Sequence, residues 1–174
     1  FWILLLLMVC AGACELAISQ WASAFAEKGL HVNKTVGDLA GPCAFAVLMG
    51  TTRALYAKFS NKISLERVML YSGILCVSSY LTAAFAPWPG LSLLGCALCG
   101  VSVGVLWPGT FSLAAKGMPS GGTAMFALLA LGGDVGCTIG PALVGQVSEA
   151  LGENLKAGVL AGTIFPALLI VVVL

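Results

Sequence analysis

The 174 residues are 60% hydrophobic and only 9% charged, with a formal net charge of +1. About a quarter of the residues of a soluble domain carry a charge, so this composition excludes an ordinary soluble enzyme. A net charge this small also argues against nucleic acid as a partner. Together with 22 glycines, which are common in membrane helices, the composition predicts an integral membrane protein.

Apolar runs separated by polar or proline-containing segments predict six transmembrane helices, because each span needs about 20 apolar residues. These runs show no two-residue alternation and are about twice as long as a barrel strand, which excludes a transmembrane β-barrel. We expect one all-α, polytopic bundle over 1–174. The expected spans are about 2–25, 38–58, 66–86, 90–115, 122–148 and 157–174.

The first span carries an acidic residue, Glu15, near its middle. An ionisable side chain at the bilayer centre costs about 2.5–3.5 kcal/mol, so its presence needs a reason. Gly12 and Ser19 share its helix face, which suggests that Glu15 faces inward. We expect it to have no basic partner at its depth and therefore to bind a proton. The alternative is a carboxyl group hydrogen-bonded between helices in a structural role.

Two further candidates, Gln20 and Trp21, follow in the same span. The amide could hydrogen-bond a ring-shaped solute and the indole could stack on it. Trp21 could equally be an interfacial or packing residue.

The second span ends in a basic cluster, which places the following loop in the cytoplasm by the bias of Lys and Arg toward that side. With six spans, both chain ends are then cytoplasmic as well. Most of the cluster is expected to set topology and to touch anionic lipid. Arg53, one or two turns inside the span, could instead snorkel, or hold a helix end or an acid at the cytoplasmic face, and is our candidate gating residue. The cluster consists of Arg53, Lys58, Lys62 and Arg67.

The third and fourth spans are divided at Pro87-Trp88-Pro89-Gly90, because paired prolines and a glycine cannot continue a helix. Trp107, in the fourth span, is a further candidate for the wall of a solute site. The adjacent Pro108-Gly109 predicts a kink, as does Gly140-Pro141 in the fifth span.

The fifth span carries the second acidic residue, Asp134, near its middle. It shares a stripe of small and polar residues with Ala130 and Thr138, so we expect it to face inward and to contact protons or solute. As with Glu15, we expect no basic partner at its depth, and a structural hydrogen bond is the alternative.

The cysteines and the histidine give no sign of metal or catalytic chemistry. All seven cysteines lie in apolar stretches and are interpreted as packing residues. Cys96 and Cys99 form a CxxC pair without a second pair or a nearby histidine, so we expect no metal and no cofactor. The single histidine, His31, lies in a polar outer loop without a serine or cysteine motif, which argues against an intramembrane enzyme.

Glycines spaced four residues apart predict close helix–helix contacts in several spans. These are Gly37/Gly41, Gly100/Gly104, Gly132/Gly136/Gly140 and Gly158/Gly162.

A weak internal repeat relates the second and fifth spans. Phe45-Ala46-Val47-Leu48 is similar to Phe126-Ala127-Leu128-Leu129, and the two groups of three spans run in opposite senses across the membrane. Inverted repeats of this kind are common in secondary transporters, with the substrate site where the repeats meet.

Four segments, in order, resemble the second half of the major facilitator superfamily of transporters. Met49-Gly50-Thr51-Thr52-Arg53, with Lys58 and Lys62, is similar to a degenerate form of its cytoplasmic loop signature. The other three resemble the seventh, tenth and eleventh helices of the fucose permease and glucose/galactose transporter branch. They are Gly12-Ala13-Cys14-Glu15 to Trp21, Leu106-Trp107-Pro108-Gly109-Thr110-Phe111-Ser112-Leu113-Ala114, and Gly121 to Gly145.

This resemblance implies a twelve-helix carrier of which the chain forms helices seven to twelve, the N-terminal half completing a central cavity. Its expected activity is alternating-access symport of a small polar solute, such as a sugar, with protons across the plasma membrane. Two departures stand out. Thr52-Arg53-Ala54 replaces the usual Gly-Arg, and Asp134 stands where the sugar permeases carry no acid. The alternative function is a structural or receptor-like membrane protein that transports nothing.

Overall fold

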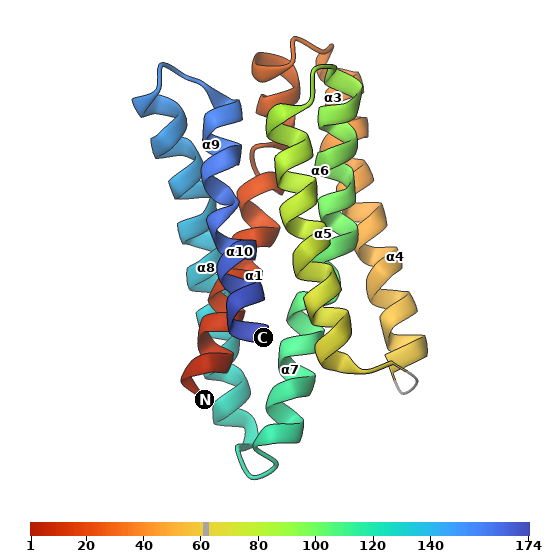
Figure 1. The fold of residues 1–174 in the computed structure, drawn as a ribbon, viewed down its shortest axis with the longest axis vertical. Helices are drawn as coiled ribbons and strands as arrows, with labels where there is room; N and C mark the ends of the chain where they lie inside the picture. Colours follow the sequence, from red (N-terminus) through yellow and green to blue (C-terminus); the bar gives the residue numbers. More distant parts are fainter. Residues whose placement is uncertain (61–62) are drawn as a thin grey trace.

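The computed structural model describes residues 1–60 and 63–174, and over these residues all regular structure is helical (Figure 1). The expectation of an all-α polytopic protein is therefore confirmed. One residue of the basic cluster, Lys62, lies outside the described residues. The main helices are α1 (Trp2–Ser19), α4 (Ala44–Phe59), α5 (Leu65–Phe85), α6 (Pro89–Val103), α7 (Leu106–Gly117), α8 (Gly122–Ala150), α9 (Leu155–Gly162) and α10 (Ile164–Val173).

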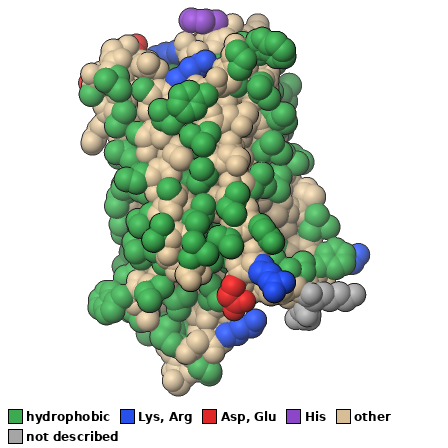
Figure 2. All heavy atoms as spheres, in the orientation of Figure 1, with side chains coloured by type: hydrophobic (Ala, Val, Ile, Leu, Met, Phe, Trp, Pro, Cys, Tyr) green, Lys and Arg blue, Asp and Glu red, His purple; other side chains and the backbone are tan. Residues whose placement is uncertain are grey.

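Five helical segments in the described residues are long and apolar enough to cross a membrane. They are Trp2–Gly29, Leu65–Phe85, Pro89–Gly117, Gly122–Ala150 and Leu155–Val173. Figure 2 shows the consequence on one face of the molecule: apolar side chains cover the middle of the bundle, and charged side chains gather at its two ends. The chain termini lie toward the same end of the bundle, the lower one in Figure 1.

The region of the expected second span is helical but interrupted. Helix α3 (Lys34–Asp38) leads into a π-helix, η2 (Leu39–Cys43), which contains Pro42, and then into α4. This segment is not among the five that meet the length and apolarity of a span, and α4 carries Arg53 and Lys58. The end of the first span is likewise irregular, with α2 (Ala22–Ala24) and a second π-helix, η1 (Phe25–Gly29), after Trp21.

Prolines explain two further breaks, one between α6 and α7 and the other between α9 and α10. A proline has no N–H to donate to the carbonyl group four residues earlier, so a helix tends to break there. α6 ends at Val103 and α7 starts at Leu106, around the position four residues before Pro108. The same offset from Pro166 gives Gly162, where α9 ends. By contrast, α8 continues through Pro141 without a break in the helix.

The bundle is cross-connected between its two groups of three spans. α1, from the first group, packs along α8 of the second, while α4 of the first packs along α6 of the second (Figure 1). The helix that opens each group thus pairs with the middle helix of the other. α5 and the α9–α10 pair pack against this core from the outside.

Glycines make the cross-connections possible, and the predicted close contacts are confirmed. A Cβ atom added to Gly140 would lie 2.6 Å from the carbonyl oxygen of Ala13, and one at Gly104 would lie 2.9 Å from that of Met49. Added Cβ atoms at Gly12, Gly100, Gly136 and Gly158 would overlap carbonyl oxygens of the neighbouring helix. Only a residue without a side chain lets two helix backbones approach this closely.

Cysteines and one tyrosine fill the centre of the bundle. Cys14, Cys76 and Cys99 are fully buried, and the sulfur atoms of Cys76 and Cys99 lie 3.9 Å apart. The hydroxyl group of Tyr80 donates a 2.8 Å hydrogen bond to the carbonyl oxygen of Cys14, which ties α5 to α1. Five of the seven cysteines are buried, as expected for packing residues; Cys43 is exposed and Cys137 is partly exposed.

Candidate functional site

Glu15 and Arg53 form an ion pair between α1 and α4. Nη2 of Arg53 lies 3.0 Å from Oε2 of Glu15 and donates a hydrogen bond to it. The Glu15 side chain is 16% exposed and that of Arg53 is 41% exposed. The expectation that Glu15 has no basic partner at its depth is therefore wrong. Arg53 lies six residues before the end of α4, and its long side chain reaches the acid four residues before the end of α1.

The local sequence places both charges on the same side of the bundle. Gly12, one turn before Glu15, sits against the backbone of α8 at Gly133. On α4, the hydroxyl group of Thr52 bonds to the carbonyl oxygen of Leu48 within the same helix, at 2.9 Å. Thr52 is thus satisfied by its own backbone, whereas the neighbouring Arg53 reaches across to Glu15.

Gln20 and Trp21 line a cleft of about 440 Å³ at the far end of α1. The indole N–H of Trp21 donates a 3.0 Å hydrogen bond to the carbonyl oxygen of Pro141. A Cβ atom added to Gly145 would lie 2.8 Å from the indole ring, so this glycine leaves the space that the ring occupies. The ring is therefore held at a fixed place on α8. The cleft is lined by Gln20, Trp21, Cys137, Thr138, Pro141 and Ala142.

Trp107 belongs to a separate aromatic group. Its ring packs over Gly133, where an added Cβ atom would lie 2.7 Å from a ring carbon. Phe111 lies beside it with a centroid distance of 6.3 Å, and Phe126 follows at 5.9 Å from Phe111. Nε1 of Trp107 is buried and has no hydrogen-bond partner in the described residues.

Asp134, the residue after Gly133, lies on the exposed face of α8. Its backbone carbonyl oxygen accepts a 3.1 Å hydrogen bond from the hydroxyl group of Thr138, which is also exposed. Within residues 1–60 and 63–174, no basic side chain pairs with its carboxylate. The two candidate acids thus differ: Glu15 is half-buried and paired, and Asp134 is uncovered by this chain.

Two residues that the sequence did not single out as site residues connect these features. Cys137 lines the cleft beside Trp21 and lies within electrostatic reach of both Glu15 and Asp134. Tyr56, one turn after Arg53, places its hydroxyl group 3.4 Å from that of Ser112 and links α4 to α7. Cys137 could have been predicted as a site residue, because it lies one turn after Asp134 on the same helix stripe. Nothing in the sequence marked Tyr56 as a site residue.

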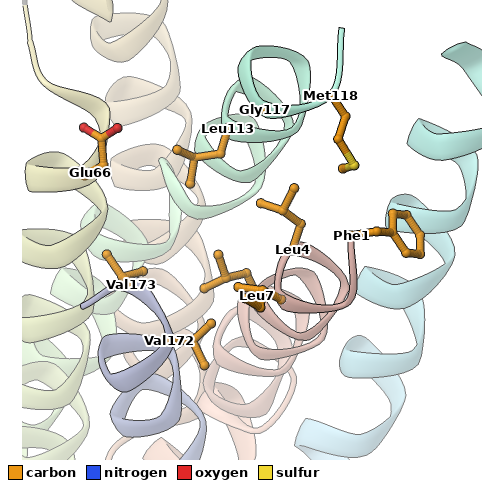
Figure 3. Close-up of a pocket in the computed structure, with 10 residues that line it drawn as sticks. Phe1, Leu4, Leu7, Glu66, Leu113, Gly117, Met118, Val172 and Val173 are labelled. Atoms are coloured by element: carbon orange, nitrogen blue, oxygen red, sulfur yellow. The ribbon is translucent and has the colours of Figure 1, made fainter. Parts of the chain in front are cut away.

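A second hollow lies at the end of the bundle that holds the chain termini. It measures about 400 Å³, and Figure 3 shows its lining: apolar side chains from α1, α7 and α10, with Glu66 of α5 at one side. None of the predicted site residues lines it. The polar candidates therefore gather elsewhere, between α1, α4 and α8.

The charge pair and the cleft are two separate features of the site. The attraction between Glu15 and Arg53 depends on the negative charge of the carboxylate, so a proton on Glu15 would remove it. The cleft is lined by both polar and apolar side chains and includes neither residue of the pair.

Comparison with known proteins gives a consistent result. A family model described as Major Facilitator Superfamily matches residues 1–141. A curated relative from Rhizobium meliloti, named Membrane protein MosC, is 31% identical over 136 residues. The matching region covers 78% of this chain and 33% of the relative, so the chain spans about a third of the length of that protein. No solved structure matches the chain.

Proposed function

We propose that this chain, which belongs to the major facilitator superfamily, forms the C-terminal six-helix half of a proton-coupled secondary transporter. The family is one of integral, multi-pass membrane transporters, in keeping with the five span-length apolar helices. An N-terminal half would complete the central cavity, and rocking of the two halves would expose it to each side in turn. We place the carrier in the plasma membrane with both ends of this half in the cytoplasm. The proposed cargo is a small polar solute, a sugar by resemblance to the fucose permease branch.

The ion pair between Glu15 and Arg53 is the observation that carries the coupling proposal. A proton on Glu15 cancels the charge that holds Arg53, so one protonation event changes the contact between α1 and α4. A charged side chain within the membrane is costly, so loss of the negative charge on Glu15 favours a rearrangement around Arg53. Through such a pair, protonation of Glu15 would change the position of α4 relative to α1. A symporter needs a link of this kind between proton binding and helix movement.

Asp134, Gln20, Trp21 and Trp107 are the proposed walls of the solute path, with Arg53 as the gating residue. Asp134 and Gln20 lie on exposed faces of this chain, where an N-terminal half or the solute could meet them. The fixed ring of Trp21 beside the 440 Å³ cleft supports a stacking role for it. Trp107 packs against Gly133 and supports the helix turn that carries Asp134.

Uptake assays on the complete gene product test this proposal. Proteoliposomes with an imposed proton gradient would be screened with labelled neutral sugars and small acids, and then repeated with Glu15→Gln and Asp134→Asn. We expect gradient-driven accumulation to fall at least about tenfold in each variant, since neither amide can carry a proton. The exposed loop variant Glu153→Gln is the matched control and should accumulate solute like the parent.

Two outcomes would contradict the proposal. The first is accumulation equal to that of the parent in both variants at every pH. The second is robust solute flux through residues 1–174 reconstituted alone, since half of a carrier should insert into the membrane and transport nothing. A protein that binds no solute and moves no protons would instead favour the structural or receptor-like alternative.

A further inference from the structure

On one edge of the Arg53 guanidinium group, one N–H donor has an acceptor in the described residues and the other has none. Nη2 donates to Glu15, but Nε, the donor beside it on the same edge of the group, is buried and has no acceptor in the described residues. Buried donors in proteins are nearly always paired, so an unpaired one needs an explanation. An acceptor supplied from outside the chain would satisfy it.

The geometry of the edge formed by Nε and Nη2 favours a carboxylate as the acceptor. The planar guanidinium presents two parallel N–H groups that match the two oxygens of a carboxylate. Glu15 uses this edge through a single contact of 3.0 Å. A solute carboxylate that displaced Glu15 could use both donors of this edge at once.

Charge balance links this acceptor to the proton. With Glu15 ionised, the pair carries no net charge. With Glu15 protonated, Arg53 is left as an unpaired cation, which the membrane disfavours unless an anion takes the place of the carboxylate. A neutral solute cannot supply that charge, whereas a monoanion restores neutrality.

The other titratable groups around Glu15 do not replace the anion. On α8, Cys137 and Asp134 lie nearby, but Asp134 forms no ion pair in the described residues. On α5 and α6, Tyr80, Cys76 and Cys99 gather at Cys14 and bond to its carbonyl group or to each other. None of these groups accepts a hydrogen bond from Arg53 in the described residues, which leaves a bound anion as the acceptor that we propose.

We infer that Arg53 binds the carboxylate of a monoanionic solute, which replaces Glu15 as its partner when Glu15 accepts a proton. This inference rests on the proposed function and names the class of its substrate. Proton and anion then enter the site together and cross the membrane with no net charge.

Pairs of solutes that differ only in the carboxylate test the inference. The complete protein is reconstituted into liposomes containing a pH-sensitive dye, and internal acidification is recorded after adding D-glucuronate or D-glucose, and gluconate or sorbitol. We expect an acid, and not its neutral counterpart, to carry protons inward. Liposomes without protein give the passive background.

Arg53 variants assign the effect to this residue. Arg53→Lys keeps the positive charge but loses the paired donors, and we expect the half-saturating concentration of the acid to rise at least about tenfold. Arg53→Gln should abolish acidification. Lys58→Gln, which removes a positive charge from the exposed end of the same helix, should behave like the parent. Glu15→Gln should still exchange labelled acid across the membrane, without proton movement.

The possible results separate this inference from the proposed function. Equal proton entry with the neutral solutes overturns the anionic substrate and leaves proton-coupled transport standing. An unchanged half-saturating concentration of the acid in a well-folded Arg53→Lys protein overturns the assignment of the carboxylate to Arg53. Absence of proton entry with all four solutes also overturns the inference, and the labelled-solute screen then decides whether the carrier proposal fails with it. Size-exclusion profiles of the variants show that they are folded.

Discussion

Helix α1 contacts its two neighbours α8 and α4 in different ways. Toward α8 the contact is backbone against backbone, with Gly12 and Gly136 leaving no room even for a methyl group. Toward α4, which is not among the closely packed partners of α1 in the described residues, the contact is the ion pair between Glu15 and Arg53. Glycine contacts do not respond to a proton, whereas an ion pair does. The contact of α1 with α8 is therefore insensitive to protonation, and its contact with α4 is the one that a proton on Glu15 would weaken.

The largest expected effect comes from breaking the glycine contact. Gly136→Ala places a Cβ atom on the carbonyl oxygen of Val9, and because both are backbone-fixed, the helices must move apart. We expect a loss of about 3 kcal/mol, the upper part of the usual range for overpacking. Thermal unfolding followed by size-exclusion chromatography in detergent measures it.

Gly50→Ala is the matched control for this variant, because nothing lies within 4 Å of an added Cβ atom at Gly50. Its stability should equal or exceed that of the parent, since alanine favours a helix over glycine. Similar destabilisation by both variants would show that helix propensity, and not the close approach of α1 and α8, sets the effect.

A smaller effect is expected at the ion pair. A double-mutant cycle of Glu15→Gln and Arg53→Gln should give a coupling energy of about 1 kcal/mol at neutral pH, reduced from that of a fully buried pair because Arg53 is 41% exposed. Unfolding free energies of the four proteins provide the value. Strictly additive single-variant effects would mean that the pair does not hold α4 to α1.

The smallest effect is expected where α1 ends against α8. Trp21→Phe removes the N–H that donates to Pro141 but keeps a ring over Gly145, so we expect a loss of about 0.5–1 kcal/mol. The exposed Trp88→Phe, at 73% exposure, is the control and should change stability by less. Equal losses in both would remove Trp21 from the rigid part of the α1–α8 contact.

The fold and much of its close packing could be predicted from local features of the sequence. Apolar length predicted the helices, and glycine spacing predicted the close contacts at Gly104 and Gly140. The breaks four residues before Pro108 and Pro166 follow from the missing N–H of proline, yet we predicted a kink only at the first of them. The missing N–H of Pro166 predicts the end of α9 at Gly162 from the sequence equally well.

The candidate site was predicted only as separate residues. Glu15 was identified by the energetic cost of its charge and Arg53 by its place inside the span that ends in the basic cluster, but 38 positions separate them in the chain. We placed Arg53 near the cytoplasmic end and therefore expected Glu15 to be unpaired. The prediction failed because the arginine side chain is long, which brings its charge to the carboxylate of Glu15.

By itself, the sequence determined a multi-helix membrane protein with two acidic residues inside its apolar spans. Transfer of apolar length into lipid and the chemistry of proline and glycine are local properties, so they can be read in order along the chain. Only the tertiary structure decided that one acid is paired and the other uncovered. A membrane helix is apolar on nearly all sides, so its sequence pattern hardly reveals which face meets which neighbour, and that choice is made when the helices pack.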